Sequence, residues 1–87
     1  MTGRGNVETL VLLQPMLVDT NSPDRDGMLI VANGLLVGIL VHLDAPEHGE
    51  TTGWFLEAGF GRLNGVRAPI FDTLDQATRW VRDSFRG

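Results

Sequence analysis

Hydrophobic residues are concentrated in one stretch, residues 28–43, which reads MLIVANGLLVGILVHL. A β-strand with one wet face alternates apolar and polar residues, whereas a strand covered on both faces reads as a continuous hydrophobic run. The Asn33-Gly34 pair in the middle is a strong signal for a two-residue hairpin turn. The stretch therefore predicts two strands joined by a tight turn, with both faces of the pair hidden from water.

Counting outward from this turn assigns each side chain to one face of the hairpin, because successive residues of a strand point to opposite sides. The pairs expected across the hairpin are Ala32 with Leu35, Ile30 with Val37, and Met28 with Ile39. The first face then carries Met28, Ile30, Ala32, Leu35, Val37, Ile39, Val41 and Leu43. The second carries Leu29, Val31, Leu36, Gly38, Leu40 and His42.

The segment before the hairpin divides into three parts. Residues 1–6 are polar and glycine-rich, and we expect them to be disordered. Residues 7–18 are mostly apolar; Pro15 would break a helix there, so extended structure at a sheet edge is favoured. Residues 20–27, TNSPDRDG, are turn-forming and predict a loop.

Two further loops and one strand follow the hairpin. Residues 44–53 are polar and predict a solvated loop, and residues 54–60, WFLEAGF, predict a third strand. Residues 61–69 contain two glycines and end in a proline, which indicates a second irregular loop. In the third strand, alternation places Trp54, Leu56, Ala58 and Phe60 on one side and Phe55, Glu57 and Gly59 on the other.

A C-terminal helix is predicted to begin at Thr73. Thr73 with Gln76 three residues later fits a capping box. Aspartates near the start and arginines towards the end complement the helix dipole. An apolar stripe at helical spacing consists of Leu74, Ala77, Trp80, Val81, Ser84 and Phe85.

Together these elements predict an α+β fold: a three- or four-stranded antiparallel β-meander with one C-terminal α-helix packed on one sheet face. Residues 7–87 form one small domain, which matches the length of 87 residues. We expect the helix to cover the face that holds Trp54, Leu56 and Ile39.

Composition narrows the function classes. The chain has no cysteine, which excludes disulfides and thiolate metal sites. Its net charge of −4 argues against a broad surface for nucleic acid or an anionic membrane, although a local basic patch stays open. All seven basic residues are arginine, which suggests a GC-rich, bacterial genome. No signal peptide or stretch long enough to span a membrane is seen, so a cytoplasmic protein is expected.

Three groups of residues are candidates for chemical sites. Carboxylates surround His48 in residues 44–50, but they are nearly contiguous and no second cluster completes a coordination shell, so no metal site is predicted. The glycines of residues 59–65 lack the spacing of a dinucleotide fingerprint and indicate a bulge and a turn. Arg62 and Arg67 in that region could meet an anion. His42 and Glu57, as cross-strand neighbours, could form an acid–base pair.

The helix start Asp72-Thr73-Leu74-Asp75-Gln76-Ala77, after three strands, resembles the N-terminal domains of HicB-type antitoxins. The resemblance covers this short motif and the order of elements, and the DNA-binding tail of many such antitoxins has no counterpart after Gly87. This overlap does not assign the family.

The second sheet face leads to the functional hypothesis. A single helix covers one face, so the opposite face would expose an apolar patch too large for a soluble monomer. That patch is predicted to be an interface, formed by Leu29, Val31, Leu36, Leu40 and Phe55. The chain would then be a protein–protein interaction domain, as a homodimer or a regulatory partner subunit, without a cofactor.

Three alternatives remain open. Residues 7–18 could fold over the second face and make a monomer. The chain could instead bind a small ligand or an anion through loops 44–53 and 61–69, with Arg62, Arg67, His42 and Glu57 as candidate residues. An enzyme ranks third, because it would rest on His42, His48 and Glu57 alone.

Overall fold

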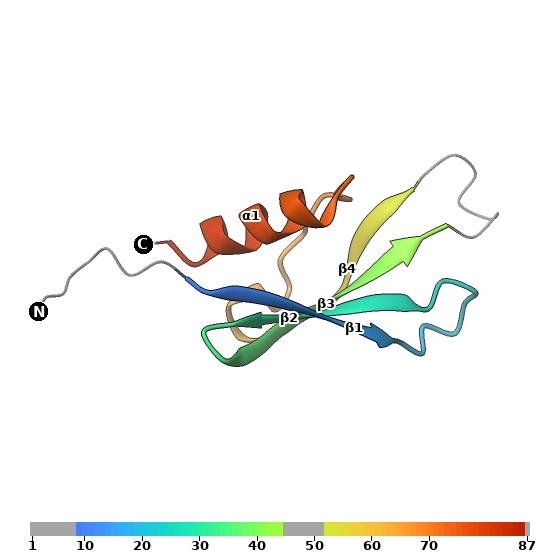
Figure 1. Cartoon of the computed structure of the whole chain (residues 1–87), viewed down its shortest axis with the longest axis horizontal. Helices are drawn as coiled ribbons and strands as arrows, with labels where there is room; N and C mark the ends of the chain where they lie inside the picture. Colours follow the sequence, from blue (N-terminus) through green and yellow to red (C-terminus); the bar gives the residue numbers. More distant parts are fainter. Residues whose placement is uncertain (1–8, 45–51, 87) are drawn as a thin grey trace, which may run out of the picture.

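The computed structural model describes residues 9–44 and 52–86, which form a four-stranded antiparallel sheet with one helix on it (Figure 1). The strands lie in sequence order and are followed by a 3-10 turn, η2, and a helix, α1. The predicted α+β meander with a C-terminal helix is confirmed, in its four-stranded form. The elements are β1 (Val11–Leu17), β2 (Asp26–Ala32), β3 (Leu35–Leu43), β4 (Gly53–Gly59), η2 (Gly61–Leu63) and α1 (Leu74–Ser84).

The N-terminal apolar segment forms β1, an edge strand paired with β2. The expected extended structure is therefore confirmed. The alternative in which this segment covers a sheet face is wrong for residues 11–17, because they lengthen the sheet sideways.

The turn between β2 and β3 has the predicted geometry. Asn33 has a φ of 51° and Gly34 a φ of 85°. Positive φ at both central residues is the requirement of a type I′ turn, whose twist matches that of the two strands. The pairing of Ala32 with Leu35 next to the turn is confirmed.

Beyond this pair, the predicted hairpin register is wrong because β3 contains a bulge. Ile30 pairs with Gly38 and Val31 with Leu36, which leaves Val37 as an extra residue in β3. From Gly38 onward, each side chain of β3 lies on the face opposite to the one that simple alternation assigns.

A second register shift affects β4. Ile39 pairs with Ala58 and Leu40 with Leu56, so Glu57 is the extra residue in β4. Glu57 is exposed. The predicted alternation therefore holds for Trp54 and Leu56 but not for Ala58, which follows the bulge and pairs with Ile39.

The helix begins as predicted. Thr73 is the N-cap, and its hydroxyl accepts a hydrogen bond from the backbone N–H of Gln76 at 3.1 Å. The Gln76 side chain returns towards the loop and accepts from the backbone N–H of Asp72 at 3.0 Å. Two backbone donors at the helix start are thereby satisfied by side chains.

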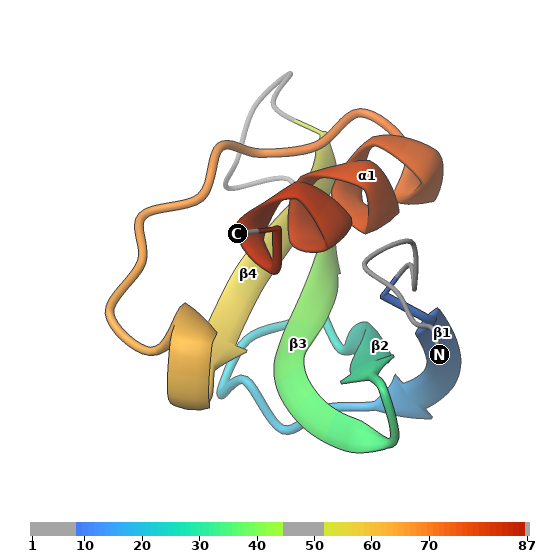
Figure 2. The ribbon, with the colours of Figure 1, turned by 90° about the vertical axis from the view of Figure 1, so that its left-hand side faces the viewer.

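One face of the sheet and the apolar stripe of α1 enclose the core (Figure 2). The expectation that α1 covers Trp54 and Leu56 is confirmed, but Ile39 lies outside this core. The buried members of the core are Ile30, Ala32, Val37, Leu40, Leu63, Phe71, Ala77 and Val81. Leu74, Trp80 and Phe85 of the predicted helical stripe pack against them.

Candidate functional site

The sheet face opposite α1 carries an apolar surface that remains accessible. Leu12, Val31 and Leu36 are aligned across three strands, and the next row towards the middle of the sheet brings Leu29 beside Ile39. Side chains at paired positions of neighbouring strands lie on the same face. Leu12 is 56% exposed, Leu36 45% and Phe55 of β4 40%. Leu29, Val31 and Ile39 are half-buried. We name this surface the open face and define it by Leu12, Leu29, Val31, Leu36, Ile39 and Phe55.

Four of the five predicted interface residues lie on this face, and the placement of Leu40 there was wrong. Leu40 is 1% exposed and belongs to the core under α1. The cause is the extra residue Val37, which moves Leu40 to the helix side and Ile39 to the open face.

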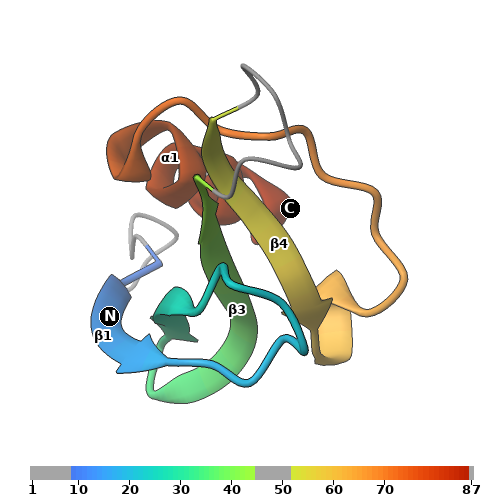
Figure 3. The same ribbon diagram turned by 90° about the vertical axis from the view of Figure 1, so that its right-hand side faces the viewer.

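The connection between β1 and β2 covers one end of the same side of the sheet. In Figure 3 it extends across the end of the sheet towards β4. Val18 packs over Gly27 so closely that Gly27 has no room for a side chain. Asp24, which is 3% exposed, accepts a hydrogen bond through its carboxylate from the backbone N–H of Asp44 at 2.9 Å. The connection therefore closes this end and leaves the open face beside it uncovered by the described residues.

The outer edge of β1 is poorly suited to pairing with another strand. The backbone N–H of Asn33 donates to the carbonyl of Leu10, and that of Val18 donates to the carbonyl of Arg25. Even-numbered residues of β1 thus direct their backbone groups to β2, and odd-numbered residues direct theirs outward. Pro15 occupies an outward position in the middle of the strand, where its missing N–H removes a donor from the edge.

The outer edge of β4 is covered near its start by the chain itself. Trp54 and Phe71 form an antiparallel bridge in which each N–H donates to the other's carbonyl, at 2.7 and 2.9 Å. Further along, a side chain on Gly59 would collide with the carbonyl of Leu63. Both edges of the sheet are thus obstructed in part, whereas Leu12, Leu36 and Phe55 of the open face are exposed to a partner.

The expectation that His42 and Glu57 are cross-strand neighbours is wrong, so the geometry considered for an acid–base pair is not formed. His42 pairs with Trp54 across the strands, and the two rings lie 4.8 Å apart. Its Nδ1 atom is 3.7 Å from a carboxylate oxygen of Asp44. Glu57 is bulged out of the ladder and lies three residues further along β4. A bulge of this kind has no clear signature in the spacing of the apolar residues.

Arg62 and Arg67 do not join His42 in one site. The Arg62 guanidinium lies 5.0 Å above the centre of the Phe85 ring, at the C-terminal end of α1. His42 lies with Trp54 near the other end of the helix, which is about 16 Å long. Arg67 is exposed in the connection to α1. Of the two predicted ligand-binding loops, 61–69 is described and exposes both arginines, while most of 44–53 lies outside the described residues.

Within residues 9–44 and 52–86, no cluster of three or more His, Cys, Asp or Glu side chains could hold a metal ion. His48 and the carboxylates beside it lie outside these ranges, as do residues 1–6, which were expected to be disordered. In the same ranges, no helix has the length and apolar character needed to cross a membrane.

Comparison of this chain with known proteins finds no relative. Neither protein-family models, nor curated proteins, nor solved structures give a match to this chain.

Proposed function

We propose that this chain is a small cytoplasmic protein–protein interaction domain whose open face binds the open face of a second copy. The observation that supports this most directly is the one-sided cover of the sheet. α1 buries the face that holds Ile30 and Leu40, while Leu12 and Leu36 on the other side stay about half exposed.

The chemistry of the open face suits an interface core. Its six defining side chains are apolar, and the exposed polar residue beside them, Gln14 opposite Leu29, is uncharged. Charged residues are depleted at the centres of protein interfaces. Burying a large apolar side chain is worth about 1.5–3 kcal/mol if it starts fully exposed, so half-exposed residues contribute less each. The six residues together supply the apolar area that would offset the entropic cost of association.

The size of the face argues for a reversible dimer. Four strands about 4.8 Å apart, over about six residues of about 3.3 Å each, present roughly 400 Å² in projection. Protruding side chains make the accessible area of each face larger than its projection. The total area buried by two copies would then be about 1,000 Å², which is the low end for specific interfaces. A two-fold contact needs only one self-complementary patch, which a surface of similar apolar residues provides.

Leu36→Glu tests this proposal. The charge would be buried in the dimer but solvated in the monomer, so the variant should fold and remain monomeric while the wild type approaches twice the chain mass as concentration rises. Analytical ultracentrifugation or light scattering over a concentration series measures the mass, and circular dichroism confirms the fold.

Leu35→Glu is the matched control. Leu35 is the adjacent residue, is 69% exposed and pairs with Ala32 on the helix side of the sheet. The Leu35→Glu variant should dimerise like the wild type. A wild-type chain that is monomeric at every concentration, or equal loss of the dimer in both variants, would show the proposal to be wrong.

A further inference from the structure

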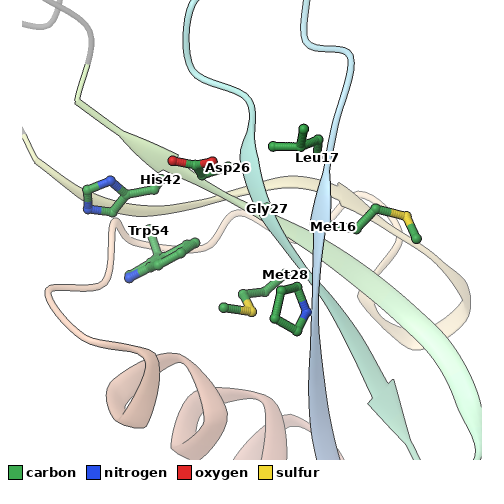
Figure 4. Close-up of a pocket in the computed structure, with 8 residues that line it drawn as sticks. Met16, Leu17, Asp26, Gly27, Met28, His42 and Trp54 are labelled. Atoms are coloured by element: carbon green, nitrogen blue, oxygen red, sulfur yellow. The ribbon is translucent and has the colours of Figure 1, made fainter.

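A second surface lies on the helix side of the sheet, beyond the part that α1 reaches. α1 has 11 residues and is about 16 Å long, whereas the nine residues of β3 extend for about 30 Å. Part of the strand ends is therefore left without helical cover. There the structure has a groove of about 620 Å³, which we name the end groove (Figure 4). Its lining consists of Pro15, Met16, Leu17, Asp26, Gly27, Met28, His42 and Trp54.

The end groove combines an apolar lining with one carboxylate. Figure 4 shows His42 and Trp54 on one side, Leu17 and Met16 on the other, and Asp26 and Met28 between them. Its volume is in the range of sites for small molecules, which are mostly apolar with few polar groups that fix orientation.

The charges around the end groove favour a positive ligand. Asp26 lines it, and Asp44 lies 3.7 Å from His42 at its margin. Arg25, next to Asp26 in the sequence, does not line the end groove; it lines an adjoining hollow of about 250 Å³ that shares Leu17 with the groove and also contains Asp19. A cation in the end groove would be attracted to the carboxylate of Asp26. An anion would instead meet the carboxylate of Asp26.

We propose that the end groove binds a small organic cation with an aromatic or aliphatic body, placing the apolar part against Trp54 and Met28 and the positive charge beside Asp26. This inference is independent of the dimer, because Met28 and Trp54 pack on the core side of the sheet and the open face lies on the other.

The test is an NMR titration with three probes of similar shape and different charge: 2-phenylethylamine in its protonated form, 2-phenylethanol and 3-phenylpropionate. The amine should give saturable shifts at the amides of Asp26, Met28 and His42 and at the indole N–H of Trp54. The indole of Trp80, whose ring packs on Phe71 at 5.5 Å, should not move. The alcohol should bind about two- to fivefold more weakly, and the anion more weakly still.

Asp26→Asn removes the charge at an exposed position and should lower the affinity for the amine to that for the alcohol, while leaving the alcohol unchanged. Asp83→Asn is the matched control, because Asp83 is an exposed aspartate in the last turn of α1, and it should bind both probes like the wild type. The absence of saturable shifts up to the solubility limit of the amine would overturn the proposal. So would equal affinity for all three probes, or shifts confined to the open face.

Discussion

The two faces of the sheet are built from the same kinds of side chain but have different surroundings. On one face, Leu40 is 1% exposed beneath Ala77 and Val81 of α1. On the other, Leu36 of the same strand is 45% exposed. The first face is covered by α1. Among the described residues, the second face is covered at one end, by the β1–β2 connection. Apolar character alone therefore does not identify the core, because burial depends on which face α1 covers.

Replacing one leucine on each face of β3 by alanine should give the largest difference in stability between the two faces. Leu40→Ala removes a fully buried side chain beneath α1 and should lower the free energy of unfolding by about 2–5 kcal/mol. Leu36→Ala should lower it by less than about 1 kcal/mol when measured at concentrations where the chain is monomeric. Denaturant unfolding followed by circular dichroism gives both values. Equal losses would mean that the two faces are equally buried in solution.

A smaller effect is expected at the covered end of the open side. Asp24→Ala removes the acceptor for the backbone N–H of Asp44 and leaves that donor without its partner. The free energy of unfolding should fall by about 1–3 kcal/mol, and amide exchange at Asp44 should become faster. Asp19→Ala is the control, because Asp19 is exposed and bonds locally to the N–H of Asn21. If both variants lose the same stability, Asp24 does not hold the connection in place.

The smallest effect tests the cover on the helix side. Thr73→Ala removes the N-cap acceptor of α1 and should cost about 0.5–2 kcal/mol of stability. Thr73→Ser keeps a hydroxyl at the same place and should recover most of the loss. An unfolding midpoint for Thr73→Ala equal to that of the wild type would show that the cap contributes nothing to holding α1 on the sheet.

Local signals in the sequence were sufficient for the elements of the fold. The Asn33-Gly34 turn and the Thr73 cap depend on neighbouring residues, and both occur where the sequence placed them. Pro15 indicated an edge strand, which is what β1 is. In each case the deciding chemistry lies within a few residues of the chain.

The site was predicted less well because its residues depend on the register between strands. The extra residue Val37 reverses the faces of the β3 side chains that follow it, so Leu40 and not Ile39 is predicted at the interface. Glu57 does the same for Ala58 in β4. Gly38 beside the first bulge is the signal that could have warned of it. Leu12 on the open face was recoverable from alternation along the first strand, once that strand was placed beside β2.

The obstructed edges of the sheet have a consequence for how far association can proceed. A strand edge accepts new strands repeatedly, so edge pairing leads to open-ended fibres, whereas a two-fold contact between faces is complete once two copies have met. Pro15 in β1 and the Phe71 bridge beside β4 both hinder the open-ended route. If two copies associate through the open face as proposed, the expected assembly therefore ends at the dimer.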